Sequence, residues 1–201
     1  MRGGLGGELA NRLLKALESG DVLEVVAEAN SFLEERRLGR VIIVGGYAVE
    51  LYTGSAYRTG DADLLVEGGA DLLRRALSLI EEWRGRAWVS RGLKYAIGIV
   101  STSYDRPKPL PILEVGEKRV HVEPPEESVV SCLNACVYWG SDLDCEKAAM
   151  IMTAQWSVID WEYLEKRCRE EGVHEKFLEI KRVVEEVRSG EPALQPGSRP
   201  A

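Results

Sequence analysis

Between residues 41 and 66 the chain joins two apolar runs through a glycine pair and a short helical pattern. Apolar runs of four or five residues bounded by turn residues are typical of buried strands. The second run opens with Asp61-Ala62-Asp63, and side chains alternate along a strand, so both carboxylates point to one face. The segment therefore predicts two neighbouring carboxylates close to the turn formed by Gly45 and Gly46.

Paired carboxylates near a glycine turn suit the binding of a divalent metal and of phosphate. Mg²⁺ prefers carboxylate oxygens, and glycine lets the backbone approach a phosphate at the positive end of a helix. Two simpler interpretations remain. Asp61 and Asp63 also suit a turn that opens a strand, and Gly45-Gly46 also suits a dinucleotide-binding turn, although the motif G-x-G-x-x-G is absent.

The pattern of the whole chain predicts an α/β (α+β) fold, in which a mixed sheet is flanked by helices and followed by a helical region. Helical spacing of apolar residues predicts a fourth helix from Asp71 to about Trp83. Other helices are expected before residue 39 and again after residue 124, the latter at about 126–138, 142–155, 160–171 and 173–188. Five or six short strands are expected between them. The expected parts are N-terminal helices at 1–39, an α/β core at 40–123, a C-terminal helical region at 124–189 and a disordered tail at 190–201.

Composition is that of an ordinary globular protein, with 45% hydrophobic and 29% charged residues among 201. The chain has no apolar run of about 18 residues and no apolar segment of the signal-peptide type at its start. A cytoplasmic protein without a membrane partner is therefore expected. The many Glu and Arg residues are compatible with a thermophilic source.

The net charge of −7 is unevenly distributed, because residues 84–119 carry eight basic and three acidic side chains. Such a basic segment attracts a triphosphate or a nucleic-acid backbone, or it forms a solvated face of a sheet. Its basic residues are Arg84, Arg86, Arg91, Lys94, Arg106, Lys108, Lys118 and Arg119.

The cysteines and the remaining aromatic and histidine residues favour packing over chemistry. Reduced thiols are expected for Cys132, Cys136, Cys145 and Cys168, as buried core residues and not as a zinc site. Trp139, Trp156, Trp161 and Tyr163 recur at helical spacing and are expected to pack between helices, with base stacking as the alternative. His121 is expected at the surface, with a place facing the site as the alternative.

The strand, Gly-Gly turn, helix and Asp-x-Asp strand together resemble the nucleotidyltransferase fold of the polymerase-beta superfamily. The strings Val44-Gly-Gly-Tyr-Ala-Val-Glu-Leu-Tyr52 and Thr59-Gly-Asp-Ala-Asp-Leu64 are similar to those of an uncharacterised archaeal and bacterial group. Its relatives include minimal nucleotidyltransferases and abortive-infection toxins. The resemblance covers roughly residues 40–170.

This resemblance implies a nucleotidyltransferase-like mixed sheet and a metal-dependent transfer of a nucleoside monophosphate from an NTP to a hydroxyl acceptor. Asp61 and Asp63 would be the catalytic, metal-binding residues for Mg²⁺ or Mn²⁺. Gly45 and Gly46 would bind phosphate, and Arg58, three residues before Asp61, would contact the triphosphate. The acceptor would be a nucleic acid, a protein or a small molecule.

The family pattern also implies a third carboxylate on a neighbouring strand, and here the chain departs from it. Gly98 takes that position in the best alignment of the strand, and no acidic residue occurs from Lys94 to Ser103. Asp105, Glu114 and Glu123 are the candidate replacements. The alternative is a catalytically degenerate binding protein with a partner protein, similar to one half of a toxin–antitoxin pair.

Overall fold

The computed structural model describes residues 4–80, 82–85, 87–89 and 93–190. These form two compact units: unit 1 takes in the described residues up to 51 and those between 58 and 124, and unit 2 those of 52–57 and 125–190. The expectations for Arg86, for Arg91 and for the tail beyond Gly190 fall outside the described residues.

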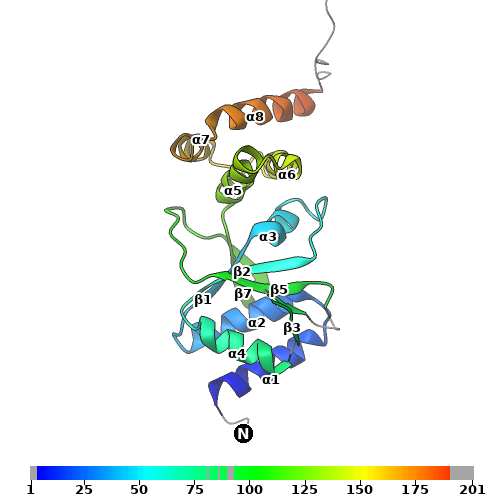
Figure 1. The fold of residues 1–201 in the computed structure, drawn as a ribbon, viewed down its shortest axis with the longest axis vertical. Helices are drawn as coiled ribbons and strands as arrows, with labels where there is room; N and C mark the ends of the chain where they lie inside the picture. Colours follow the sequence, from blue (N-terminus) through cyan, green and yellow to red (C-terminus); the bar gives the residue numbers. More distant parts are fainter. Residues whose placement is uncertain (1–3, 81, 86, 90–92, 191–201) are drawn as a thin grey trace, which may run out of the picture. The chain divides into compact units, whose positions relative to one another are not determined.

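Unit 1 is built on a seven-stranded mixed sheet with the strand order β3-β4-β5-β2-β1-β7-β6 (Figure 1). β1 pairs with β2 in antiparallel and with β7 in parallel orientation, and β2 pairs with β5 in parallel orientation. The strands are β1 (Arg40–Val44), β2 (Asp61–Glu67), β3 (Glu82–Trp83), β4 (Trp88–Val89), β5 (Ala96–Ser101), β6 (Ile112–Val115) and β7 (Lys118–Val122).

Three helices cover one face of this sheet, while α3 (Gly45–Tyr52) lies on the other (Figure 1). The three are α1 (Leu5–Leu17), α2 (Val22–Glu35) and α4 (Ala70–Ile80). Leu64 of β2 and Ile97 of β5 line the same apolar core as Leu13, Leu73 and Leu77 of these helices. Each such side chain contributes about 1.5–3 kcal/mol on burial, so this layer fixes which face β2 turns away from the helices.

The prediction that the fourth helix continues to Trp83 is wrong, because α4 ends at Ile80 and Trp83 lies on β3. The indole rings of Trp83 and Trp88 lie 4.5 Å apart, and Nε1 of Trp88 donates to Oγ of Ser78 at 3.0 Å. A tryptophan pair across a hairpin whose two strands have two residues each stabilises this pairing. Strands this short leave no alternating pattern in the sequence.

The prediction that His121 lies at the surface is also wrong. His121 is buried on β7, between β1 and β6, and its Nε2 lies 2.8 Å from Oε1 of Glu34. Arg119 donates to the other oxygen of the same carboxylate at 3.0 Å. Glu34 thus joins α2 to β7 through side chains that lie far apart in the sequence.

Unit 2 contains α5 (Pro125–Tyr138), α6 (Asp142–Ala154), α7 (Trp161–Glu170) and α8 (His174–Ser189), within two residues of the predicted bounds. Ser141 and Asp160 cap the starts of α6 and α7 by accepting backbone N–H groups. Gly190 closes α8 in the left-handed region, with φ of 74°. None of the described helices has the length and apolar character needed to cross a membrane.

A buried ion pair connects α5 and α7 within unit 2. Arg167 donates through Nε to the fully buried Glu127 at 3.0 Å, and the hydroxyl of Tyr163 donates to the same carboxylate. Arg167 also pairs with Glu170 and Glu171 on its own helix and beyond it. The buried charge of Glu127 is therefore compensated by a guanidinium and a hydroxyl.

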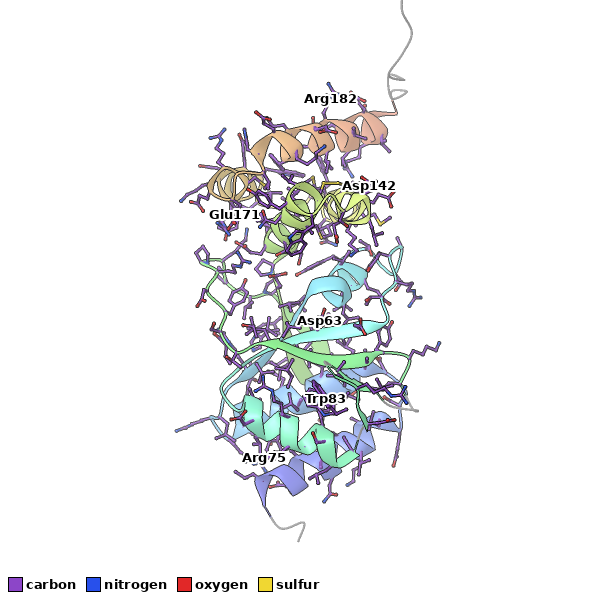
Figure 2. All side chains as sticks on the ribbon, viewed as in Figure 1. Asp63, Arg75, Trp83, Asp142, Glu171 and Arg182 are labelled. Atoms are coloured by element: carbon purple, nitrogen blue, oxygen red, sulfur yellow. A yellow bond between two sulfur atoms is a disulfide. The ribbon has the colours of Figure 1, made fainter. Side chains whose placement is uncertain are left out.

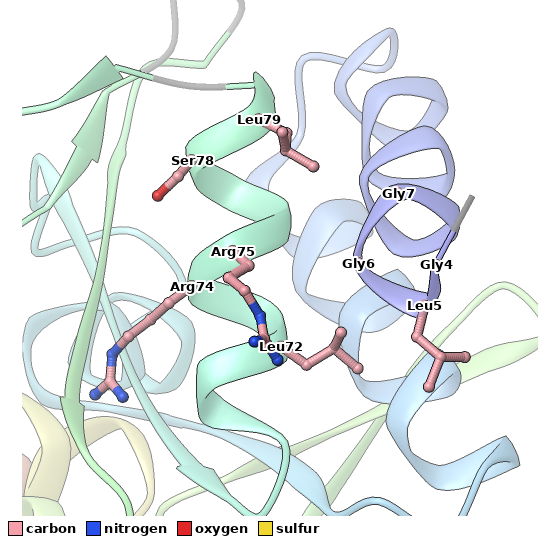
Figure 3. Close-up of a pocket in the computed structure, with 9 residues that line it drawn as sticks. All are labelled: Gly4, Leu5, Gly6, Gly7, Leu72, Arg74, Arg75, Ser78 and Leu79. Atoms are coloured by element: carbon pink, nitrogen blue, oxygen red, sulfur yellow. The ribbon is translucent and has the colours of Figure 1, made fainter. Parts of the chain in front are cut away.

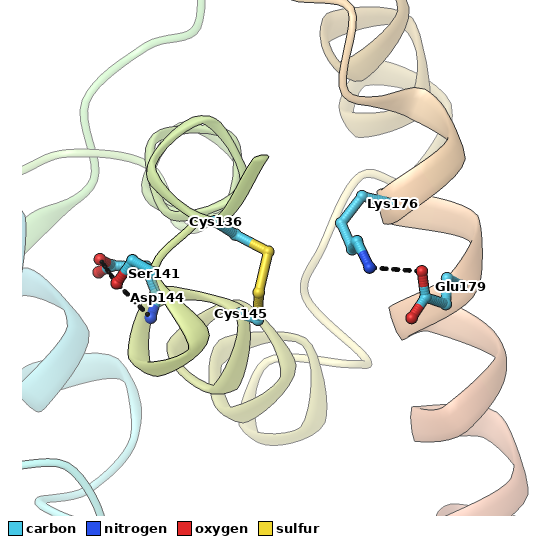
Figure 4. The surroundings of a disulfide bond; sticks show 6 residues. All are labelled: Cys136, Ser141, Asp144, Cys145, Lys176 and Glu179. Carbon is cyan, nitrogen blue, oxygen red and sulfur yellow. Dashed lines mark hydrogen bonds and ion pairs between the residues drawn. A yellow bond between two sulfur atoms is a disulfide. The ribbon is translucent and has the colours of Figure 1, made fainter. Parts of the chain in front are cut away.

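The expectation of four reduced cysteines is wrong for one pair, because Cys136 of α5 and Cys145 of α6 form a disulfide (Figure 4). The tight turn between these helices brings the two Cα atoms to 5.0 Å, a separation that a disulfide spans. Cys132 and Cys168 are buried thiols, as expected. Burial raises the pKa of the Cys168 thiol to about 12.

The tryptophans of unit 2 follow the packing expectation in two of three cases. The ring centroids of Trp156 and Trp161 lie 4.3 Å apart, with Arg188 over the first ring and Lys181 over the second, each 4.9 Å from the ring centroid. Trp139 is different, because 83% of its surface is exposed. It follows the last turn of α5, at the point where the chain leaves that helix for the turn into α6.

Candidate metal and phosphate site

Asp61 and Asp63 open β2 on the face opposite to α1, α2 and α4. The intervening Ala62 is fully buried, whereas Asp61 is exposed and Asp63 is half-buried. Figure 2 shows Asp63 on the α3 side of the sheet. The alternation predicted from the sequence therefore brings both carboxylates to one face, which the helical layer leaves open.

Gly45 brings the start of α3 against Asp63. It follows Val44, the cross-strand partner of Asp63, and adopts a φ of +62°. A Cβ atom built on Gly45 would lie 3.1 Å from Oδ2 of Asp63, closer than ordinary contacts. Both the backbone conformation and the lack of space require glycine at this position. Gly46 follows as the second residue of α3, at the end of the helix that favours anions.

Glu50 of α3 organises the loop that leads into β2. Its carboxylate is 4% exposed and accepts from Nη1 of Arg58 at 2.9 Å and from the backbone N–H of Thr59 at 3.0 Å. The hydroxyl of Tyr95, just before β5, also donates to it at 2.7 Å. Arg58, predicted to contact a triphosphate, is thus held by an ion pair while 70% of its side chain stays exposed.

The charge of Glu50 is stabilised in place. Burial by itself raises the pKa of this carboxyl, but the donors from Thr59, Tyr95 and Arg58 outweigh burial and hold the pKa below its ordinary value. Burial and the adjacent carboxylate together raise the pKa of Tyr95. At neutral pH the arrangement is therefore a carboxylate, a neutral phenol and a guanidinium.

The position next to Asp63 on the other side of β2 carries no side chain. Gly98 of β5 is the cross-strand partner of Asp63, and Ala96 is that of Asp61. The alignment made from the sequence, which assigned Gly98 to the place of a third carboxylate, thus agrees with the strand register. Neither partner on β5 has a side-chain oxygen to offer the pair.

The three candidate replacements lie on other parts of unit 1. Glu123 is buried, and its N–H donates to the carbonyl of Ile43 at 2.8 Å, which places it beside β1 and two strands away from β2. Glu114 is exposed on the edge strand β6, and Asp105 follows β5 in a loop where Oγ of Ser103 donates to it. None of the three occupies a strand adjacent to Asp63.

The carboxylate oxygens of this site suit a Mg²⁺ ion that takes its remaining ligands from a bound substrate and from water. Within the described residues no group of three or more His, Cys, Asp or Glu side chains forms a metal cage. Mg²⁺ is commonly held by one or two carboxylates, with phosphate oxygens and water completing its six ligands. Asp61 and Asp63 fit that manner of binding and do not fit a permanent structural metal.

Glutamates pair with Arg84, Lys118 and Arg119 of the basic segment. Lys118 pairs with Glu28 at 2.7 Å, and Arg119 pairs with Glu34 at 3.0 Å. Arg84 pairs with a neighbouring acid on β3, Glu82, at 3.0 Å. Glu28 and Glu34 belong to α2, outside the basic segment, and Glu82 lies in the same hairpin as Arg84. The charge excess seen in the sequence therefore does not produce a matching excess along β3 and β7.

A hollow lined mainly by apolar groups lies on the helical side of unit 1. It has a volume of about 670 Å³ between the start of α1 and α4, with Leu5, Leu72, Arg75 and Leu79 among its lining residues (Figure 3). Because Asp61 and Asp63 face away from the helical layer, the hollow is separate from the carboxylate pair.

Glu50 and Tyr95 hold the loop before Asp61, and neither residue was predicted from the sequence. Glu50 lies five residues after Gly45 on the buried side of α3, and a charged residue among Tyr47, Ala48 and Val49 was the available signal. A buried acid in an apolar helix requires partners. Which partners these are depends on the β2–β5 pairing, which local pattern does not reveal.

No protein-family model matches the sequence, and no curated protein matches it. Among solved structures, the solution structure of the antibiotic-resistance factor ANT(2'')-Ia is similar to this chain. The two share 14% identity, with 89% of this chain and 96% of that chain covered and a TM-score of 0.42.

The fold predicted from the sequence, a mixed sheet with flanking helices and a C-terminal helical region, is confirmed. β1, the Gly-Gly turn, α3 and β2 follow one another in the order that the resemblance to nucleotidyltransferases predicts.

Proposed function

We propose that unit 1 carries a metal-dependent nucleotidyl-transfer site, which moves a nucleoside monophosphate from an NTP to a hydroxyl acceptor. The observation that carries this proposal is the close approach of Gly45 to Asp63 at the start of α3. It joins a helix N-terminus, which favours phosphate, to two carboxylates on one strand face, which favour Mg²⁺ or Mn²⁺.

The proposed roles follow from the chemistry of each group. Asp61 and Asp63 bind the divalent ion, Gly45 and Gly46 orient phosphate oxygens through backbone N–H groups, and Arg58 adds positive charge beside them. A bound ion neutralises the triphosphate and favours deprotonation of the attacking hydroxyl. The acceptor oxygen loses its proton to solvent water and forms a bond to the α-phosphorus, the bond from that phosphorus to the bridging oxygen breaks, and pyrophosphate leaves.

The acceptor belongs to one of three classes: nucleic acid, protein or small molecule. Pairing of Lys118 and Arg119 with glutamates reduces the case for a nucleic acid bound along β7. All three classes carry a hydroxyl group. They can be distinguished by which fraction of a cell extract, RNA, protein or small molecules, becomes labelled.

A second candidate function is binding without turnover, as in a catalytically degenerate nucleotidyltransferase fold with a partner protein similar to one half of a toxin–antitoxin pair. Gly98 favours it, because this residue pairs with Asp63 where a third carboxylate would complete the site. The exposed Trp139 and Tyr138 of unit 2 offer apolar surface to such a partner.

The test incubates the protein with each α-³²P-labelled NTP, Mg²⁺ or Mn²⁺, and separate RNA, protein and small-molecule fractions of a cell extract. Transfer of the α-label with release of pyrophosphate, lost in Asp61→Asn and Asp63→Asn, supports the transferase. A γ-labelled NTP serves as the control, because its label must leave with pyrophosphate. Nucleotide binding without transfer supports the second candidate, and absence of both overturns the nucleotide site.

A further inference from the structure

We propose that Glu50 is a positioning residue of this site, which holds Arg58 ready for the triphosphate without itself touching the nucleotide. The inference rests on the proposed function, since it concerns the same site. It deepens that function by assigning the preorganisation of the anion-binding arginine to a carboxylate on α3.

The geometry of Arg58 carries the inference. A long arginine side chain that is 70% exposed ordinarily samples many rotamers and loses that freedom when it binds a ligand. Here Nη1 is fixed on Glu50 at 2.9 Å, and the carboxylate it binds is 4% exposed and cannot follow the arginine into solvent. A guanidinium has five N–H donors in a planar fork, so this one bond leaves donors for phosphate oxygens.

Glu50 also fixes the backbone on which Arg58 is carried. Its second oxygen accepts the N–H of Thr59 at 3.0 Å, so the carboxylate binds a side chain and the next backbone amide at once. Thr59 in turn accepts the N–H of Asp61 through Oγ1 at 3.3 Å. One buried carboxylate thus holds Arg58 through its guanidinium and through the backbone amide that follows it.

Tyr95 also holds the carboxylate of Glu50 in place. Its hydroxyl donates to the same oxygen as Arg58, at 2.7 Å, and its ring packs 5.1 Å from that of Tyr47 on α3. The carboxylate is therefore held from the β5 side as well as from the loop. Loss of the Arg58 bond alone leaves the donors from Tyr95 and Thr59 on Glu50, so the role in positioning and the role in folding are separable.

Glu67 provides a matched control at the other end of β2. It too is a carboxylate that accepts from an arginine, Arg40, at 2.6 Å and from a backbone N–H, that of Tyr104, at 3.2 Å. It lies at the last position of the strand that Asp61 opens. Glu67→Gln therefore removes a comparable ion pair without touching the proposed site.

The test is a double-mutant cycle on the Kd of Mg²⁺ complexes of non-hydrolysable ATP, GTP, CTP and UTP, measured by calorimetry. We expect Glu50→Gln and Arg58→Ala each to weaken binding by about tenfold, the size of one charge-assisted hydrogen bond. The double variant should bind no more weakly than Arg58→Ala alone, because Glu50 acts through Arg58. Glu67→Gln should leave the Kd unchanged.

Two results would overturn the inference while the nucleotide site stands. One is a Glu50→Gln effect that persists in full in the Arg58→Ala background, which would make Glu50 a general support of the fold. The other is normal nucleotide binding by Glu50→Gln. A wild-type protein that binds none of the four analogues would instead overturn the proposed function, and this inference with it.

Discussion

Gly98 of β5 lies directly across from Asp63 of β2 in the parallel register of the sheet. On the other side of Asp63, Gly45 lies so close that a Cβ atom there would be only 3.1 Å from Oδ2. Asp63 is thus placed between two glycines. In the proposed function, Gly45 orients phosphate, and Gly98 stands where the family pattern has a third carboxylate. The arrangement supports the proposal of phosphate and metal binding, and position 98 is where that proposal is tested most simply.

A carboxylate introduced at Gly98 should strengthen metal binding. Gly98→Asp adds an oxygen ligand beside Asp63, so the affinity for Mn²⁺ should rise by about tenfold, the equivalent of about 1.4 kcal/mol. Mn²⁺ titration followed by electron paramagnetic resonance measures the change. Gly98→Asn is the control of equal size. Equal affinity in the two variants would show that position 98 does not face the metal.

A side chain at Gly45 should damage the site more than it damages the fold. Gly45→Ala forces alanine to a φ of +62°, which costs about 1–2 kcal/mol of unfolding free energy, and pushes against Asp63. Gly116 has a similar φ of +60° with open space around it, so Gly116→Ala carries the strain alone. Urea unfolding should give similar losses for both variants, while only Gly45→Ala loses nucleotide affinity. Equal nucleotide affinity in both would contradict the contact.

Acid should weaken the junction of α1 and α2. Hydrogen bonding to Arg12 lowers the pKa of Glu35 to about 2 from the ordinary 4.5. A carboxyl with a lowered pKa in the folded state stabilises the fold above pH 4.5, and this stability is lost as the pH falls toward 2. Because Glu35 is half-exposed, we expect less than about 1 kcal/mol. Thermal unfolding between about pH 6 and 3 should show a shallower acid slope in Arg12→Gln; an unchanged slope would contradict the pair.

Reduction of the Cys136–Cys145 disulfide should destabilise unit 2. The bond closes a loop with a sequence separation of 9, for which loop entropy predicts about 2.5 kcal/mol. Denaturant unfolding with and without dithiothreitol measures the loss, and the Cys136→Ser/Cys145→Ser variant should be insensitive to the reductant. A wild type equally stable in both conditions would contradict a stabilising bond. Cys132→Ser tests whether the buried thiol on the same helix contributes.

The features that could be predicted from the sequence are those that depend on residues close to one another along the chain. The helices of unit 2 begin and end close to their predicted bounds, where Ser141, Asp160 and Gly190 form local caps. The alternation at Asp61 and Asp63 depends on strand periodicity, which is equally local. The place of Gly98 beside Asp63 was instead expected from the resemblance to nucleotidyltransferases.

What the sequence did not reveal depends on contacts between distant segments. Glu50 meets Tyr95 across 45 positions, and His121 meets Glu34 across 87. Trp83 lies on β3 and not on α4 because its ring packs on that of Trp88, and the helical spacing of the sequence gives no sign of this contact. The disulfide likewise depends on how α5 packs on α6.

The most direct test of the metal and phosphate site measures the affinity of Mn²⁺–NTP complexes for the wild type and for Asp63→Asn, by calorimetry at one fixed salt concentration. This substitution keeps the shape of the side chain and removes its charge, so binding of the complex should weaken by at least about tenfold while the melting temperature changes little. Equal affinity in the two proteins, or binding in neither, would contradict a nucleotide site built on Asp63.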